Sequence, residues 1–343
     1  MIVVRAPLRV SFVGGGTDLP SFYRKRKGQV LSATIDKYVY VVINRTPMLH
    51  QVSARYSISE TVPHPKELQH TRIKEALLDL GIEKGLEIAS FATLPSRTGL
   101  GSSSSFSVAL LKGLHAYQDK KIDAHDLGAA ASRLEIDLVG EPIGKQDQYA
   151  SALGGFNIIQ FHADESVKSE SLLLDFETRL KFEDHLLLFY TGITRDASSV
   201  LKKQSQVSSE EEKFRTLSDM ADSVPEFKDR LLGGDIKGVG HMLHEGWMRK
   251  KSLVGNISNG AIDALYDEGI RSGAWGGKVL GAGGGGCLLF VVSPDKKKEL
   301  AVRLGRVAAK EGLSDYQVVP FHFVQSGAQV LYNGDHFHKE ILN

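Results

Sequence analysis

The first half of the chain mixes segments with β-strand periodicity and segments with helical periodicity. Residues 1–13 are apolar or alternating, with β-branched side chains, and predict a strand that ends in three glycines. Residues 30–44 alternate in the same way and predict a second strand, and residues 87–93 predict a third. Between them, residues 67–80 have apolar side chains at helical spacing and predict a helix that a glycine closes. Both kinds of element are therefore expected here.

The rest of the chain continues this mixture. Helices are expected from the serine-rich stretch to about residue 118 and over 124–139, 227–240 and 260–273, and strands over 172–176, 185–190 and 317–330. The 227–240 segment has few apolar side chains and is expected to lie exposed. A domain boundary is expected near residues 180–195, because 343 residues more often form two domains than one.

The amino-acid composition limits the classes of partner that the protein is expected to bind. The 42 Lys and Arg residues balance 41 Asp and Glu residues, giving a net charge of +1, which offers no global attraction to nucleic acid or to an anionic membrane. Cys287 is the single cysteine, so no intrachain disulfide can form. The N-terminus does not resemble a signal peptide, and no apolar run is long enough to span a bilayer. We expect a cytoplasmic protein, either a monomer or a homo-oligomer.

Glycine is enriched in three short clusters, and the second of them begins the serine-rich stretch. Residues 94–110, LPSRTGLGSSSSFSVAL, contain Gly99 and Gly101 and pass directly into an apolar helical pattern. A loop that leads into a helix N-terminus presents free amide N–H groups and the positive end of the helix dipole, so an anion is the natural ligand. Ser102 to Ser105 add hydroxyl donors and a possible metal ligand. We expect a loop that binds phosphate.

The first glycine cluster, residues 14–16, follows the first predicted strand and precedes Asp18. Asp18 is expected either to cap a helix or to accept hydrogen bonds from sugar hydroxyls, and the two roles are compatible. The basic run Arg24 to Lys27 follows closely. Such a run is usually a solvated surface, but its position beside the glycine turn also suggests a partner for an anionic group of the substrate.

Carboxylates also follow the helix expected over 124–139. Glu135 and Asp137 lie near its end, and Asp147 is expected in a short polar loop after Pro142 and Gly144 interrupt the helix. The spacing alone allows Asp147 to be an ordinary surface residue.

The third cluster, Gly281 to Gly286, matches the dinucleotide fingerprint G-x-G-x-x-G. That fingerprint requires a helix after the glycines, whereas residues 287–292 are β-like, so binding of a nicotinamide cofactor is not expected. Neither glycine cluster has the Lys followed by Ser or Thr that a Walker A loop needs. The H-R-D and D-F-G motifs of protein kinases are absent from the sequence.

The sequence resembles the galactokinase, homoserine kinase, mevalonate kinase and phosphomevalonate kinase (GHMP) superfamily. The resemblance covers essentially the whole chain and rests on three ordered motifs: APLRVSFVGGGTDLPSF from Ala6, LPSRTGLGSSSSFSVAL from Leu94 and KVLGAGGGGCLLF from Lys278. It implies an α+β fold of two domains, an ATP-binding domain over residues 1–185 that resembles domain 2 of ribosomal protein S5, and a ferredoxin-like domain over 186–343.

The resemblance also implies a role for individual residues, with ATP and Mg²⁺ as cofactors. Asp147 matches the catalytic aspartate that orients or deprotonates the acceptor hydroxyl, and Arg9 matches an arginine near the γ-phosphate. The expected metal ligands are Ser103 and Glu135, with Glu135 favoured over Asp137. The loop residues expected to bind ATP are Gly99, Leu100, Gly101, Ser102, Ser103 and Ser104. Those expected at the sugar site are Gly16, Thr17, Asp18, Gly283 and Gly284.

The form of the first motif points to the acceptor. Galactokinases end this motif in GEHTDY, whereas this chain has GGGTDLP, which resembles heptose phosphate kinases and the fucokinase-like branch. The expected reaction is phosphorylation of the anomeric hydroxyl of D-glycero-D-manno-heptose 7-phosphate to the 1,7-bisphosphate. Two alternatives stay open: a fucokinase or other sugar 1-kinase, and, from a different class, a catalytically inert protein that senses a sugar.

Overall fold

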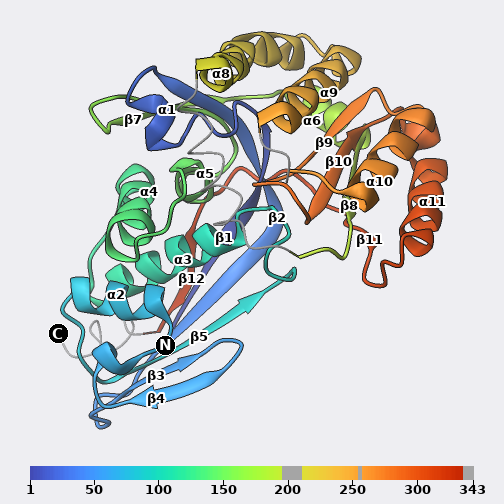
Figure 1. Ribbon diagram of the computed structural model, residues 1–343. Coiled ribbons are helices and arrows are strands. Elements are labelled where there is room, and N and C mark those ends of the chain that lie inside the picture. The colour runs from blue at the N-terminus through green and yellow to red at the C-terminus, as the bar shows by residue number, and fades with distance from the viewer. Residues whose placement is uncertain (195–210, 254–256, 335–343) are drawn as a thin grey trace.

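The molecule is built on two β-sheets, each covered by helices (Figure 1). The computed structural model describes residues 1–194, 211–253 and 257–334. In Figure 1 the larger sheet, with helices α2 to α5, occupies the left of the molecule, and the smaller sheet with α10 and α11 occupies the right. Helices α8 and α9 lie above, between the two parts.

The larger sheet has eight strands in the order β12-β1-β2-β5-β3-β4, and β6 pairs with β2 beside β5, with β7 on the other edge of β6. Its strands are β1 (Ile2–Val13), β2 (Gly28–Arg45), β3 (Val52–Arg55), β4 (Ser59–Val62), β5 (Leu86–Ala92), β6 (Phe156–Phe161), β7 (Val167–Leu172) and β12 (Gln329–Asn333). β2 is long enough to pair with β1 along one edge and, along the other, with β6 in its first half and β5 in its second. Only the pair of β3 and β5 is parallel among the described strands.

Helices cover one face of this sheet. They are α1 (Pro20–Tyr23), α2 (Thr71–Asp79), α3 (Ser102–Tyr117), α4 (Ala124–Arg133) and α5 (Gln146–Leu153), with a 3₁₀ turn at Pro65–Glu67 and a π-helical turn at Leu134–Leu138. α3 lies against the middle of the sheet, where Leu110 and Leu114 join Val4 and Ile43 in one buried cluster. Burial of that apolar face, rather than helix propensity, holds the N-terminus of α3 at a fixed point above β1.

The smaller sheet has the order β11-β8-β10-β9 and is antiparallel throughout. Its elements are α6 (Phe176–Asp184), β8 (Leu186–Tyr190), α8 (Glu211–Leu232), α9 (Ile236–Leu253), α10 (Gly260–Arg271), β9 (Gly276–Val279), β10 (Cys287–Val291), α11 (Pro294–Lys310) and β11 (Gln317–Val318). Alternate residues of a strand face opposite sides. Leu187 and Phe189 therefore pack in the cluster formed with α10 and α11, whereas Leu186 and Leu188 pack toward the larger sheet.

Aromatic side chains fill the core between the two sheets. Phe12 of β1 lies within 6.4 Å, centroid to centroid, of the rings of Phe156, Phe182, Phe227 and Phe323. Because these rings come from elements of both sheets, this core fixes the C-terminal end of β1 relative to the smaller sheet.

The α+β fold and most of the predicted elements are confirmed. The expectation of a strand over 172–176 is wrong, because β7 ends at Leu172 and Asp175 caps α6 by accepting a hydrogen bond from the Thr178 amide at 2.8 Å. The expectation of one exposed helix over 227–240 is also wrong: the segment contains the end of α8 and the start of α9, and Phe227 and Val239 are fully buried. The boundary between residues 185 and 186 stays a prediction, and β12 lies in the first sheet.

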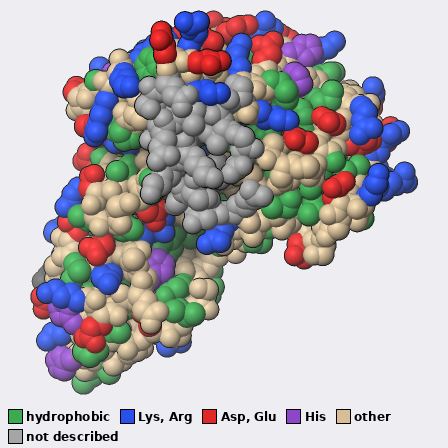
Figure 2. Space-filling model, viewed as in Figure 1, with side chains coloured by type: hydrophobic (Ala, Val, Ile, Leu, Met, Phe, Trp, Pro, Cys, Tyr) green, Lys and Arg blue, Asp and Glu red, His purple; other side chains and the backbone are tan. Residues whose placement is uncertain are grey.

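On the face shown in Figure 2, basic and acidic side chains interleave, as the near-zero net charge leads us to expect. Among the described helices, none combines the length and the apolar character that crossing a bilayer requires.

Phe12→Ala should reduce the free energy of unfolding by about 3 to 5 kcal/mol, because it leaves a cavity among four other aromatic rings. Denaturant unfolding measures the change. The matched control is Phe176→Ala, whose ring is 65% exposed, and we expect its effect to be below about 1 kcal/mol. Equal losses in the two variants would contradict the central place of Phe12 in the core.

Candidate active site

A cavity of about 360 Å³ lies where the three glycine-rich motifs meet. Its wall is formed by the end of β1 and the turn after it, the loop before α3, the N-terminal turn of α5, and the turn between β9 and β10. Most of the side chains in this wall are charged or polar. The sequence-based prediction that these motifs form one site thus corresponds to a single cavity in the described part of the molecule.

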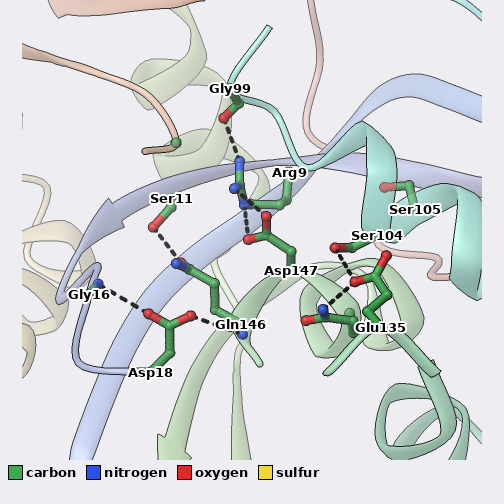
Figure 3. Close-up of polar contacts among 12 residues, drawn as sticks. Arg9, Ser11, Gly16, Asp18, Gly99, Ser104, Ser105, Glu135, Gln146 and Asp147 are labelled. Atoms are coloured by element: carbon green, nitrogen blue, oxygen red, sulfur yellow. Dashed lines mark hydrogen bonds and ion pairs between the residues drawn. The ribbon is translucent and has the colours of Figure 1, made fainter. Parts of the chain in front are cut away.

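Arg9 and Asp147 form a bidentate ion pair at the centre of the site (Figure 3). The Arg9 Nε and Nη2 atoms donate to the two carboxylate oxygens of Asp147, both at 2.7 Å, and Nη1 donates to the Gly99 carbonyl at 2.7 Å. Arg9 is 3% exposed, because it lies on the face of β1 opposite to the apolar Leu8 and Val10. The planar guanidinium thus joins β1, α5 and the phosphate-binding loop in one fixed geometry.

Asp147 lies in the first turn of α5, and not in the polar loop that the sequence predicted. Helix α5 begins at Gln146, and the side chain of the preceding residue, Lys145, makes no capping hydrogen bond to it. The position favours a carboxylate, because the N-terminal turn of a helix carries partial positive charge. The location of Asp147 beside Arg9 is therefore specified by tertiary contacts rather than by a local capping signal.

Asp18 is buried at the other side of the same wall. Its Oδ1 atom accepts a hydrogen bond from the Gly16 amide at 3.1 Å, and its Oδ2 atom accepts one from the Gln146 amide at 3.3 Å. A Cβ atom at Gly144 would lie 2.0 Å from Oδ2, so only glycine allows this approach. Burial raises the pKa of Asp18, and the negative charge of Asp147 adds to the increase.

The phosphate-binding loop and the third glycine cluster are packed backbone against backbone. The Cys287 amide donates to the Thr98 carbonyl at 2.9 Å, and a Cβ atom at Gly99 would lie 2.5 Å from the Leu280 carbonyl oxygen. Both Gly99 and Gly101 have φ near +80°, a conformation that suits glycine. The amides of Ser102 and Ser103 follow at the N-terminus of α3, and both residues line the cavity.

Glu135 is fully buried beside this loop and is surrounded by donors. Ser104 Oγ and Ser107 Oγ donate to it at 2.8 and 2.7 Å, Arg72 Nε donates at 3.0 Å, and the Gln148 amide group also donates to it. The π-helical turn at the end of α4 carries Glu135 into this position. Its serine donors are Ser104 and Ser107, and Ser103, the serine predicted to share a metal ion with Glu135, is not among them.

The side-chain oxygen atoms of Ser103 and Glu135 are of the chemical type that binds Mg²⁺. Mg²⁺ is usually held by one or two protein oxygen ligands together with substrate phosphates. Ser103 lines the cavity, and Glu135 accepts a hydrogen bond from the adjacent Ser104. Since four donors already surround the Glu135 carboxylate, an ion bound there would replace one of them. Elsewhere in the described residues, no cluster of three or more His, Cys, Asp or Glu side chains could hold a metal.

Several predicted residues do not reach the cavity wall. Thr17 is buried, and its hydroxyl donates to the Gly14 and Gln29 carbonyls, so it stabilises the turn. Gly283 and Gly284 face Ile257, whereas the neighbouring Gly281 and Ala282 line the cavity. Two further predicted residues do not line the cavity but contact residues that do: the Leu100 carbonyl accepts a hydrogen bond from the Arg9 amide, and Glu135 accepts one from Ser104.

The basic run also lies outside the cavity. Arg24 pairs with Glu165 at 2.7 Å, and Arg26 pairs with Asp222 at 2.6 Å. Lys25 lies over the ring of Phe214, with 5.8 Å between Nζ and the ring centroid. These contacts are typical of a solvated surface, so the run gains no support as a partner for a substrate phosphate.

Two lysines in the wall were missed by the sequence-based prediction. Lys250 of α9 donates to the Gly281 carbonyl, and Lys278 of β9 donates to the Ser11 and Phe12 carbonyls at 2.8 and 2.7 Å. Burial lowers the pKa of Lys250 to about 8, an effect that the charge of Arg9 increases. Burial also holds the pKa of Lys278 well below its usual range. The sequence did contain a signal for the burial of Lys250: it follows Trp247 by three residues and Leu243 by seven, and this helical spacing places it on the same face as these two buried side chains.

A second, more apolar groove of about 300 Å³ adjoins the same helix N-terminus. Ser102 and Ser103 line both spaces. The groove is further lined by the rings of Tyr56, His70, Phe91 and Phe106. A flat, apolar group attached to a phosphate on the loop could therefore lie between these rings.

Comparison with protein families identifies both halves of the chain. A model described as the GHMP kinases N terminal domain matches residues 69–155, and one described as GHMP kinases C terminal matches residues 223–310. The two models together span just over half of the sequence. The chain belongs to the GHMP kinase family. It is therefore an ATP-dependent phosphotransferase, and the cavity contains the motifs in which this GHMP kinase resembles its family.

Relatives of this GHMP kinase act on several sugars. The D-glycero-alpha-D-manno-heptose 7-phosphate kinase of Campylobacter jejuni is 26% identical, with 92% of this chain and 99% of that protein aligned. The L-fucokinase/L-fucose-1-P guanylyltransferase of Bacteroides fragilis is 25% identical over 88% of this chain, which corresponds to 35% of that longer protein.

Solved structures agree on the fold. A D-glycero-D-manno-heptose 1-phosphate kinase from Bacteroides thetaiotaomicron superimposes with a TM-score of 0.79 at 25% identity, covering 97% of this chain and 99% of the other. The galactokinase of Lactococcus lactis, complexed with galactose, gives a TM-score of 0.76 at 16% identity, with 96% and 95% covered. The second comparison is informative about the fold only.

Gly99→Ala should weaken ATP binding by at least about tenfold and destabilise the protein, because the added Cβ would overlap the Leu280 carbonyl. Gly81→Ala is the matched control: φ is +66° there as well, but no atom lies within 4 Å of the added Cβ. The control should cost only the backbone strain of about 1 to 2 kcal/mol. Titration calorimetry with ATP and thermal unfolding measure both effects, and similar ATP affinities in the two variants would contradict the role of close packing.

Proposed function

We propose that this GHMP kinase transfers the γ-phosphoryl group of ATP to the anomeric hydroxyl of D-glycero-D-manno-heptose 7-phosphate, giving the 1,7-bisphosphate and ADP. The observation that carries the proposal is the alignment with the Campylobacter jejuni heptose 7-phosphate kinase over nearly the full length of both chains. The GGGTD form of the first motif supports the same acceptor, since Gly15, Gly16 and Asp18 of this motif lie in the cavity wall.

The acceptor hydroxyl would lie against Asp147. The bidentate contact with Arg9 fixes both carboxylate oxygens, so the carboxylate can accept the hydroxyl proton or hold the oxygen in line with the γ-phosphorus. In the transfer, the bond between the β,γ-bridging oxygen and the γ-phosphorus breaks, the acceptor oxygen bonds to phosphorus, and the hydroxyl proton passes to the Asp147 carboxylate, which then releases it to solvent. Phosphoryl transfer depends mainly on such positioning and on neutralisation of charge.

Asp18 would bind the sugar hydroxyls next to the reacting one. Its two backbone hydrogen bonds leave further acceptor capacity on the carboxylate, and Gly15 and Gly16 beside it allow the ring to come close to the backbone. Because burial raises the pKa of Asp18, the group gains more from hydrogen bonds than an exposed aspartate would.

ATP would occupy both spaces. The phosphates bind at the N-terminus of α3, where Ser102 and Ser103 present amides and hydroxyls, and the adenine lies in the groove between Tyr56 and Phe106. When bound, Mg²⁺ would neutralise phosphate charge, with Ser103 and Glu135 as its protein ligands.

One other function has specific support: the Bacteroides fragilis fucokinase relative favours L-fucose as a second acceptor. A sugar-sensing protein without activity would need neither the Arg9–Asp147 ion pair nor a phosphate-binding loop beside it, so no observation favours this alternative. We also propose that the protein acts in the cytoplasm, where ATP and sugar phosphates are found.

The test of the acceptor is a panel of hexoses, heptoses and their 7- or 6-phosphates with Mg-ATP, followed by phosphorus NMR of the product. We expect the highest kcat/KM with D-glycero-D-manno-heptose 7-phosphate and a new phosphate on the anomeric carbon. A higher kcat/KM for L-fucose would establish the fucokinase alternative. Absence of product with every sugar, in a protein that binds ATP, would contradict the kinase proposal.

Asp147→Asn should lower turnover by at least about a hundredfold while leaving ATP affinity nearly unchanged, because the carboxylate faces the acceptor and not the nucleotide. Steady-state kinetics and ATP titration measure the two effects, and thermal unfolding shows whether the variant is folded. Asp137→Asn is the control, since Asp137 is exposed on the π-helical turn and should tolerate the change. Near-normal turnover of a folded Asp147→Asn would remove Asp147 from the chemistry.

A further inference from the structure

We propose that the ammonium group of Lys250 contacts the γ-phosphate of ATP and neutralises charge on the phosphoryl group during transfer. This inference rests on the proposed kinase reaction, and it assigns the role to a residue of α9 that lies outside all three glycine-rich motifs. Lys250 is 6% exposed, and its exposed part lies in the wall of the active-site cavity.

Arg9, the cation expected near the γ-phosphate, is largely committed to other partners. Three of its nitrogens donate to Asp147 and to the Gly99 carbonyl, all at 2.7 Å. The Asp147 carboxylate also balances its charge. Arg9 can therefore orient Asp147, but much of its positive charge is offset before a phosphate arrives.

Of the three other cations of the wall, two are also held by partners and the third is exposed. Lys278 donates to two carbonyls of β1, which fixes the end of that strand, and Arg72 pairs with Glu135 and Glu141. Arg97 is exposed in the loop before α3. Lys250 differs from these, because it is buried in the cavity wall and, among the described residues, its one hydrogen-bond partner is a single uncharged group, the Gly281 carbonyl.

The surroundings of Lys250 place it at the reacting end of the cavity. Four charged groups interact with it electrostatically: Arg9 of β1, Asp18 of the first glycine turn, Asp147 of α5 and Lys278 of β9. Gly281, which accepts its hydrogen bond, lies so close to the phosphate-binding loop that a Cβ atom at this position would be 2.7 Å from the Gly99 Cα. A buried ammonium group with no carboxylate in hydrogen-bond contact among the described residues is costly, and an incoming phosphate would offset this cost.

The protonation of Lys250 then gives a pH signature. Since burial and Arg9 lower its pKa to about 8, Lys250 is charged below pH 8 in the free enzyme and loses its charge as pH rises through that value. The kcat/KM for ATP should therefore fall above about pH 8. The negative charge of bound ATP raises the pKa of the ammonium group, so the corresponding fall in kcat should occur at higher pH.

Lys250→Met tests the contact, because it keeps the length of the side chain and removes the charge. We expect its ATP affinity to fall at least about tenfold while ADP affinity changes less than about twofold, as measured by titration calorimetry. The control is Lys251→Met at the next position, where the lysine pairs with Asp263 on the surface at 2.5 Å. Both nucleotide affinities should be unchanged in the control.

Two further measurements separate contact from folding. The fall of kcat/KM above pH 8 should disappear in Lys250→Met, and Lys250→Arg, which restores the charge, should recover part of the ATP affinity. Equal losses for ATP and ADP, or an unchanged pH profile, would overturn the proposal. Because the nucleotide affinities require no acceptor, they remain decisive even if the acceptor panel contradicts the proposed sugar.

Discussion

The active site depends on one ion pair, between the buried Arg9 and the partly buried Asp147. A guanidinium group that leaves water must regain its solvation from the protein, and Arg9 does so with two parallel hydrogen bonds to Asp147 and a third to the loop carbonyl of Gly99. The pair is therefore formed only when β1, α5 and the phosphate-binding loop are all in place. This constraint links correct folding of three distant segments to correct geometry at the reacting centre, and the aromatic core around Phe12 keeps β1 at the required depth.

Close backbone contact is the second constraint. The phosphate-binding loop and the third glycine cluster approach so nearly that a Cβ atom at Gly99 or Gly281 would overlap the backbone of the other segment. The first segment belongs to the half with the larger sheet, and the second to the half with the smaller sheet. The glycines thus have two functions: they permit positive φ, and they bring both halves of the molecule to the phosphates. This explains why a glycine cluster resembling a dinucleotide fingerprint lies between two strands.

Much of the fold could be predicted from the sequence, because in long segments such as β1 and α3 the pattern of apolar residues indicates directly which side chains are buried. The residues of the candidate site were harder to predict from the sequence. Asp147 has no local capping signal, and its place in α5 follows from contact with Arg9, 138 residues earlier. Lys250 lies in a run of basic residues that looks like a surface, and its burial shows only when the helical spacing from Trp247 is followed. Thr17 matched the motif, yet its hydroxyl stabilises the turn. A motif predicts that a residue lies near the site, but it does not predict where the side chain points.

The pairing of β12 with β1 has a consequence for how the protein is made. β12 contains residues 329–333, yet its place is beside the first strand of the chain. During translation, about three hundred further residues must therefore be synthesised before β12 can cover the outer edge of β1 at residues 2–5. An uncovered strand edge is a site for unwanted pairing with other chains. The nascent protein thus has a long interval in which a chaperone could shield that edge, and the larger sheet is complete only once residue 333 has been synthesised.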